Sequence, residues 1–419
     1  MIKTLILSIS LIFIVGCDSN NIDNKTSTKE TQSSNNYKNT HAYLPHSPYA
    51  NAIEKCALIE EKKDSCTLSQ LPLLGQISYS ITKNMILERL LVSHQWMGDR
   101  FAEMLDRYSQ KMIQQLFRAT TAIVIDDDII PAYYWAVTGA IYLDPHFLWI
   151  SQNEKETITK KDDYRSDFGN TLLFLEGTVY RKDGNSLYTQ DNISRSLYDV
   201  ELSLAGLLYH ELTHANDFIP PHLLSQLDNE KSVLNNIIAI ENQRISKLLY
   251  AYSPIESETL KALGQVLYHG KTASAVQKQL TGVEVGNLFN DDVSDAMYAY
   301  STPYEDTAML MQSAMMKYFY NVDSFQIFLN ADAYNKGESK LEWGVRNPFL
   351  KLSVRERAVF VANYILPISN GWSDLLYGIA DSTSLLSTYP RDSHAYMGNS
   401  LHINPKELTF NKSHKLMDF

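Results

Sequence analysis

The order of apolar and polar positions predicts helices and strands in the first half of the chain and mostly helices after about residue 195. Apolar residues recur at helical spacing over 81–117, which contains no proline, so a helix interrupted at most once is expected there. The β-branched run at 121–125 predicts a strand, because the three aspartates that follow would end it. Further strands are expected at 172–180 and at 136–143, where Gly139 indicates a bulge or a close backbone approach.

One helix of the second half carries a His-Glu-x-x-His motif. Its apolar positions form a stripe at helical spacing, made of Leu197, Val200, Leu204, Leu208 and Leu212. Pro220 and Pro221 would end this helix soon after Asp217. The motif His210-Glu211-Leu212-Thr213-His214 therefore lies near the C-terminal end of the predicted helix.

The spacing of the motif suits a metal ion. On a helix His210 and His214 stand one turn apart on the same face, so both imidazoles can hold one ion. Glu211 projects about 100° around the helix from His210, which places its carboxylate beside the metal's water without making it a ligand. Two imidazoles and a carboxylate with an open fourth position suit zinc, so Zn²⁺ is the expected cofactor. A third protein ligand is then required.

The segment 298–308, Tyr-Ala-Tyr-Ser-Thr-Pro-Tyr-Glu-Asp-Thr-Ala, offers that ligand. Together with the histidine motif it resembles the gluzincin metallopeptidases, especially the lethal-factor-like and Pro-Pro-endopeptidase-like zincins. In those families a downstream helix begins with a glutamate ligand, and a tyrosine seven residues earlier contacts the reacting carbonyl. The resemblance implies Glu305 as the third ligand and Tyr298 as the oxyanion stabiliser. Those families often have an acidic residue four positions after the ligand, where this chain has Met309.

Other residues compete for these roles. Glu230 would be the third ligand if the chain followed the thermolysin type, with which it shares the string His-Glu-Leu-Thr-His-Ala, although thermolysin-like enzymes use a longer gap. Tyr300 and Tyr304 could replace the implied tyrosine. Asp217 and Asp306 could orient a ligating histidine, or they could be solvated charges at helix ends.

The resemblance also implies a fold. Zincins are α+β proteins in which a small twisted sheet precedes the active-site helix, and here a mostly helical C-terminal part would follow. The edge strand of that sheet pairs with an extended substrate in zincins, and residues 136–143 stand where this strand is expected; such strand addition favours a peptide substrate. We expect a zincin-like catalytic core at 119–320, a helical region before it at 46–118, and a helical C-terminal region at 321–419.

The first residues indicate the compartment. Residues 5–15 are apolar but too few to span a bilayer as a helix. With Gly16 before Cys17 they resemble a bacterial lipoprotein signal peptide, 1–16, whose removal leaves a lipidated Cys17. Residues 17–45 are rich in serine, asparagine, threonine and lysine, and predict a disordered tether. We expect a protein of the bacterial cell envelope that is lipid-anchored and faces the periplasm, with the choice between inner and outer membrane open.

The two other cysteines and the charge balance add two expectations. In an oxidising envelope Cys56 and Cys66 are expected to form a disulfide, the alternative being two free buried thiols. The chain of 419 residues carries 37 Lys and Arg against 48 Asp and Glu, a net charge of −11, with no long basic run. This balance does not suit the phosphate backbone of nucleic acid, so nucleic acid is not an expected partner.

These patterns predict a zinc-dependent metallopeptidase that hydrolyses a peptide or protein substrate through a metal-activated water, with Glu211 as the general base. The alternative is an envelope lipoprotein whose zinc site is structural or vestigial and whose task is binding or scaffolding. A closed structural site would need a fourth protein ligand, for which His94, His222 and His269 are candidates.

Overall fold

The computed structural model describes residues 37, 39–160, 163–187, 194–336, 338, 340–380 and 384–386. The predicted signal peptide, 1–16, and the predicted lipidation site, Cys17, lie outside these residues. Strand β1 (His41–Ala42) already belongs to a sheet, so the tether predicted to reach residue 45 ends before that strand. Among the described residues, none of the helices combines the length and the apolar character that crossing a membrane would require.

The first sheet has five short strands in the order β1-β2-β3-β5-β4. Besides β1 its strands are β2 (Leu90–Val92), β3 (Ile123–Ile125), β4 (Tyr133–Trp135) and β5 (Ala140–Leu143). Strands β2, β3 and β5 run parallel, whereas β1 and β4 are antiparallel to their neighbours. The β-branched residues of β3 are fully buried at the centre of the sheet, which confirms the strand predicted there.

Two predictions in this part of the chain are wrong. The helix expected over 81–117 is divided into α3 (Lys83–Leu87), α4 (Gln95–Arg107) and α5 (Ile113–Leu116), with strand β2 between α3 and α4. The three residues of β2 are apolar and fully buried, and so short a run fits a helical pattern equally well. The region 46–118 is therefore not wholly helical, because β2 belongs to the first sheet.

The strand expected at 136–143 is the second arm of a hairpin. Residues 136–139 form the turn between β4 and β5, and Gly139 has a φ of +70°, so this glycine serves a turn and not a bulge. The chain is also close to a neighbour here, because a Cβ at Gly139 would lie 2.9 Å from Val233 Cγ2. Strand β5 is an inner strand, and the edge position belongs to β4.

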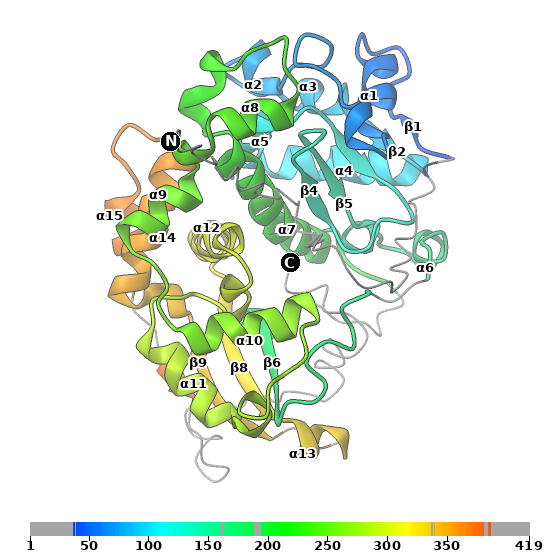
Figure 1. Cartoon of the computed structure of the whole chain (residues 1–419). Coiled ribbons are helices and arrows are strands. Elements are labelled where there is room, and N and C mark those ends of the chain that lie inside the picture. Colours follow the sequence, from blue (N-terminus) through cyan, green and yellow to red (C-terminus); the bar gives the residue numbers. More distant parts are fainter. Residues whose placement is uncertain are drawn as a thin grey trace, which may run out of the picture.

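Helix α7 (Leu197–Phe218) passes through the middle of the molecule, between the β4–β5 hairpin and helix α12 (Pro303–Tyr320) (Figure 1). Its N-terminus is a capping box in which Ser196 accepts from the Asp199 backbone N–H. Every residue from 200 to 218 is buried, so the helix carries its motif into the core. The predicted helix and the predicted position of the motif near its C-terminal end are confirmed.

The second sheet is antiparallel, with the order β10-β9-β8-β6-β7. Its strands are β6 (Phe174–Lys182), β7 (Asn185–Ser186), β8 (Asp323–Asn330), β9 (Leu341–Arg346) and β10 (Ser384–Leu386). Strand β6 confirms the strand expected at 172–180. The helical C-terminal region expected at 321–419 is wrong, because β8 and β9 lie within it and β8 pairs along its whole length with β6. Six consecutive residues of β8 are buried, so it lacks the apolar–polar alternation that indicates a strand.

The remaining helices surround these parts. They are α1 (Ala50–Ala57), α2 (Leu74–Ile77), α6 (Gln152–Lys155), α8 (Val233–Ala239), α9 (Ile245–Tyr252), α10 (Glu258–His269), α11 (Gly282–Asp291), α13 (Ala331–Asn335), α14 (Leu352–Ile365) and α15 (Ser373–Tyr377). Helices α10 and α11 pack on the second sheet in a core of their own (Figure 1). A disulfide joins Cys56 of α1 to Cys66, as predicted. The α+β class is confirmed.

Candidate metal centre

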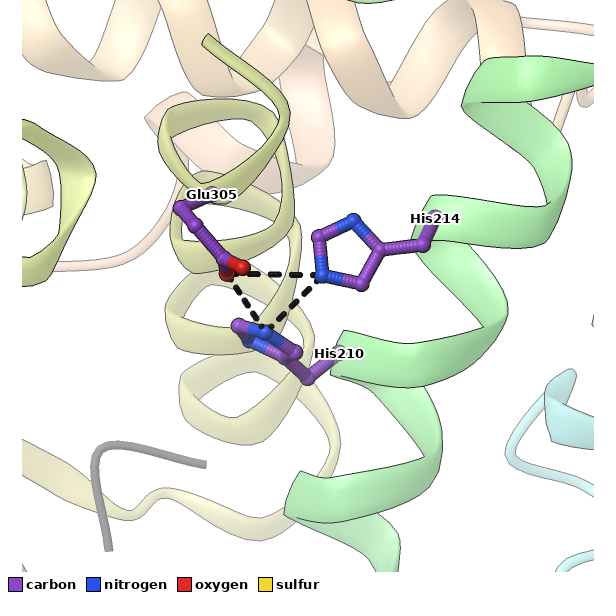
Figure 2. Close-up of side chains that lie close together, drawn as sticks. All are labelled: His210, His214 and Glu305. Atoms are coloured by element: carbon purple, nitrogen blue, oxygen red, sulfur yellow. Dashed lines mark hydrogen bonds and ion pairs between the residues drawn. The ribbon is translucent and has the colours of Figure 1, made fainter. Parts of the chain in front are cut away.

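Two helices bring three side chains of the predicted metal site together. His210 and His214 project from one face of α7, and Glu305 projects toward them from the first turn of α12 (Figure 2). Their candidate ligand atoms all lie within 4.8 Å of one another, and the three residues are buried. This group could bind a metal ion.

The distances within the group are those of atoms that share a central ion. The two imidazole Nε2 atoms are 3.2 Å apart. Glu305 Oε2 lies 2.9 Å from the Nε2 atom of His210 and 3.4 Å from that of His214. Two bonds of a tetrahedral metal, each about 2.0–2.1 Å long, place their ligand atoms about 3.3 Å apart. The three atoms thus already have the separations that a tetrahedral site requires.

A hydrogen bond fixes the tautomer of His210. Its Nδ1 atom lies 3.1 Å from Oε1 of Gln312, a buried residue two turns after Glu305 on α12. An amide oxygen only accepts, so Nδ1 carries the proton and Nε2 keeps a lone pair directed at Glu305. With Nδ1 held in this way, the Nε2 atom is the one left to ligate a metal, as in sites where a hydrogen bond holds the second nitrogen of a ligand imidazole.

Glu305 is ionised in this group. Burial alone would raise the pKa of Glu305, but the charge and hydrogen bonds that His214 and His210 supply when they are protonated outweigh burial and hold that pKa well below its usual range. The backbone also places this side chain, because Thr302 caps α12 by accepting from the Glu305 N–H.

Glu211 lies beside the group without joining it. It is fully buried, and its carboxylate accepts a hydrogen bond from the Tyr134 backbone N–H on edge strand β4. Its Oε2 atom has no hydrogen-bond partner in the part of the chain that the structure describes. Burial raises the pKa of Glu211 to about 7, against the opposing effect of His210. A buried carboxyl group of this kind can gain and lose a proton near neutral pH.

Tyr298 precedes α12 in the 3-10 helix η7 (Met297–Tyr300) and lies close to His210. The two rings are 6.2 Å apart between centroids, and Tyr298 is buried. Arg165 Nη1 donates to the Tyr298 hydroxyl at 3.4 Å. Asp163 binds the opposite edge of the guanidinium, with Nη2 to Oδ2 at 2.6 Å. Because an arginine only donates, the Tyr298 oxygen is the acceptor in this contact and its own proton points elsewhere.

The competing residues lie outside the group. Glu230 is exposed in the loop before α8, so the structure does not support it as a ligand. The Tyr300 hydroxyl donates to Asp292 at 3.0 Å, and Tyr304 packs against Phe218, with 5.3 Å between ring centroids. Of the three tyrosines considered for this role, Tyr298 is thus the one whose ring lies beside a candidate ligand histidine.

The two predicted acidic neighbours are buried and are not solvated charges. Asp217 accepts from the Ser246 N–H at 2.6 Å, and Asp306 accepts two hydrogen bonds from Arg357 of α14, with Nη1 to Oδ1 at 2.9 Å. Neither is hydrogen-bonded to a ligand histidine among the contacts that the structure describes. Asp306 instead ties the first turn of α12, and with it Glu305, to α14.

The three histidines considered as a fourth ligand are not in the group. His94 stands at the start of α4, and His222 follows α7 with its ring 6.3 Å from that of Tyr364. The Nε2 atom of His269 lies 3.2 Å from the Ser301 carbonyl oxygen. Within the described residues the group contains three candidate ligands.

Three supporting residues were missed by sequence reasoning: Gln312, Arg165 and Arg357. Gln312 had a detectable signal, since it follows Glu305 by seven residues and so shares its helix face. Arg165 and Arg357 had none, because each reaches the site from a distant part of the chain.

A comparison with protein-family models found no match, and comparisons with curated proteins and with solved structures found none either. The geometry of the site therefore carries the functional conclusion.

Proposed function

We propose that this protein is a zinc-dependent metallopeptidase of the bacterial cell envelope. One observation carries the proposal: two imidazole nitrogens and a carboxylate oxygen converge at 2.9–3.4 Å, next to a buried glutamate with an unpartnered oxygen. A zincin-like arrangement, with Glu305 as third ligand, agrees with this geometry.

The donor set suits zinc. Two neutral imidazoles and one carboxylate are ligands of catalytic zinc sites, which keep one tetrahedral position for water or substrate. When bound, the metal would supply a Lewis acid and lower the pKa of a water in that position. A structural site would need a fourth protein ligand, and the described residues of the group offer three. We therefore favour the catalytic role over a structural or vestigial one.

Glu211 would move the proton in peptide hydrolysis. Its Oε2 atom can accept a proton from the attacking water, and the same carboxylic acid can then donate this proton to the leaving amine. The Tyr134 N–H holds the carboxylate in place during both steps. The Tyr298 hydroxyl, which accepts from Arg165, would donate a hydrogen bond to the carbonyl oxygen as that oxygen becomes negative.

Edge strand β4 would hold the substrate. Its Tyr134 N–H is directed at Glu211, on the side of the strand away from its partner β5. An extended peptide paired with β4 would pass beside Glu211 with its backbone fixed by strand addition. The substrate is then a peptide or an unstructured segment of a protein, and the predicted lipid anchor would hold the enzyme at the membrane.

The variant Glu211→Gln tests the proposal. The amide keeps the size of the side chain but cannot accept the proton, so cleavage of casein should fall by about 10²- to 10⁴-fold while zinc content stays at the wild-type level. The matched control is Glu230→Gln, which changes an exposed glutamate and should leave activity and zinc unchanged. Wild-type protein that binds zinc but cleaves no peptide, or a Glu211→Gln variant that keeps full activity, would contradict the proposal.

A further inference from the structure

A cavity of about 400 Å³ lies away from the metal-binding side chains, between α2, Arg118 and the segment that follows α7. Its walls come from three separate parts of the chain: residues 75–79, Arg118, and residues 221–229. None of the three candidate metal-binding residues lines the cavity. Two of the polar side chains on these walls, Arg118 and Asn229, offer hydrogen-bond donors, and these donors indicate the kind of ligand that the cavity fits.

Arg118 provides the charge. It lies in the 3-10 helix η2 (Phe117–Ala119), and its Nε atom donates to the Gln115 carbonyl oxygen at 2.6 Å. Its two terminal nitrogens make no hydrogen bond or ion pair with any residue that the structure describes. Burial lowers the pKa of Arg118, because the cation is partly withdrawn from water without a carboxylate beside it. An anion in the cavity would compensate that cost.

Asn229 adds an oriented donor. The Leu73 backbone N–H donates to Gln76 Oε1 at 2.9 Å, so the NH₂ end of Gln76 faces Asn229. That NH₂ donates to Asn229 Oδ1 at 3.0 Å. The oxygen of Asn229 is thereby committed, and its own NH₂ is the end that remains for a ligand. The hydrogen bonds from Leu73 through Gln76 to Asn229 thus leave a donor on the wall formed by residues 221–229.

One side of the cavity is apolar, while Ser78, Tyr79 and Ser225 also line it. Pro221, Leu224 and Leu227 line the side formed by the segment after α7. Helix α2 approaches this side closely at Gly75, where a Cβ would lie 2.7 Å from Leu224 Cδ1 and 2.9 Å from Arg118 Cβ. The cavity therefore combines a cation and an amide donor with an apolar wall.

No carboxylate among the described residues lines the cavity. The two acids of the adjoining loop, Asp228 and Glu230, are exposed, and Asp228 pairs with Lys231 at 3.2 Å and accepts from the Glu230 N–H at 3.0 Å. The field inside the cavity is thus set by Arg118.

We propose that this cavity binds a carboxylate attached to an apolar group, with the carboxylate on Arg118 and Asn229 and the apolar group against Leu224 and Leu227. Arginine binds a carboxylate through a planar pair of N–H donors, and the apolar wall separates such a ligand from a bare inorganic anion. The site is independent of the metal centre and of the proposed peptidase activity.

Isothermal titration of the purified protein with N-acetyl-leucine tests this proposal. The wild type should bind N-acetyl-leucine. The neutral N-acetyl-leucinamide lacks the charge and should bind at least about tenfold more weakly, the loss expected for one charge-assisted contact. Inorganic phosphate lacks the apolar group and should also bind at least about tenfold more weakly. Arg118→Gln should weaken binding of N-acetyl-leucine by at least about tenfold, and Arg118→Lys by less. Asn229→Asp provides a second test at an exposed position, because it replaces the donor by a negative charge and should abolish binding.

The arms of the experiment also identify the source of the carboxylate. A tripeptide ending in leucine that binds more tightly than N-acetyl-leucine assigns the site to a peptide C-terminus, whereas weaker binding assigns it to a small free carboxylate. Unchanged affinity in Arg118→Gln and Asn229→Asp would overturn the proposal, because the ligand would then bind elsewhere, such as at the metal. Absence of binding to the wild type would overturn it as well.

Discussion

At the scale of residues, the metal centre depends on side chains that surround the motif. Gln312 fixes the tautomer of His210 by accepting from Nδ1, and the Tyr134 N–H holds the Glu211 carboxylate. Arg165 holds the Tyr298 hydroxyl and is itself held by Asp163. These contacts convert a short motif into an arrangement with defined donors and acceptors.

The Arg165–Tyr298 contact predicts a coupled pair. Tyr298→Phe removes the hydroxyl that would donate to the developing oxyanion, so kcat should fall by about 10²-fold with KM and zinc content unchanged. Arg165→Gln should lower kcat less, because it acts through the orientation of that hydroxyl. The double variant should then be no slower than Tyr298→Phe alone, which steady-state kinetics of the four proteins would measure.

The matched control for this pair is Tyr300→Phe, which removes a hydroxyl bonded to Asp292 and should leave kcat near the wild-type value. Independent, additive effects of the Arg165 and Tyr298 substitutions would rule out the positioning role of Arg165.

A second prediction at this scale concerns pH. Asp295 is fully buried and accepts from Ser313 Oγ at 2.5 Å, and burial raises its pKa to about 7 from a usual value of 3.8. Between these two pH values the folded protein keeps a proton that the unfolded chain releases, so Asp295 makes the protein less stable as pH rises through this window, by up to about 1.4 kcal/mol per pH unit. The variant Asp295→Asn lacks this titration. Its stability relative to wild type should therefore increase from about pH 5 to about pH 7 in urea unfolding; a difference that does not change with pH would refute the prediction.

At the scale of elements, α7 could be predicted because its signal is local. A stripe at helical spacing, two prolines and a His-Glu-x-x-His motif all lie within 25 residues, and the resemblance then led to Glu305 and Tyr298. Strands β2 and β8 could not be predicted in this way. Their residues are buried without alternation, and β8 becomes a strand through its pairing with β6, about 150 residues earlier.

The position of α12 depends on a buried ion pair. Arg357 of α14 is fully buried, binds Asp306 through two nitrogens, and also donates to the Ser253 and Val293 carbonyl oxygens, each at 2.8 Å. Arg357→Met leaves the Asp306 charge uncompensated, so the free energy of unfolding should fall by about 3–5 kcal/mol. Zinc affinity should fall too, because Glu305 adjoins Asp306.

The double variant Arg357→Met with Asp306→Asn separates these effects. It removes both charges and should be more stable than Arg357→Met alone, as measured by urea unfolding. A double variant that is less stable than the single one would show that the ion pair does not hold α12.

At the scale of the whole molecule, the structure joins two sheets through the helices that carry the metal centre. The first sheet packs against α7, and strand β8 of the second sheet follows directly after α12 (Figure 1). The boundary predicted at residue 320 therefore separates β8 from its partner β6. Contacts this distant in sequence leave no local pattern, which is why the site was easier to predict than the architecture around it.

Metal content, measured by elemental analysis, tests the central claim most directly. Wild-type protein, Glu305→Ala and Glu230→Ala would be purified in parallel, with Glu211→Gln as a variant beside the ligands. We predict one zinc ion per chain in the wild type, in Glu230→Ala and in Glu211→Gln, and loss of zinc in Glu305→Ala alone, since one of three protein ligands is removed. A wild-type protein without zinc, or zinc retained in full by Glu305→Ala, would contradict the assignment of His210, His214 and Glu305 as the metal centre.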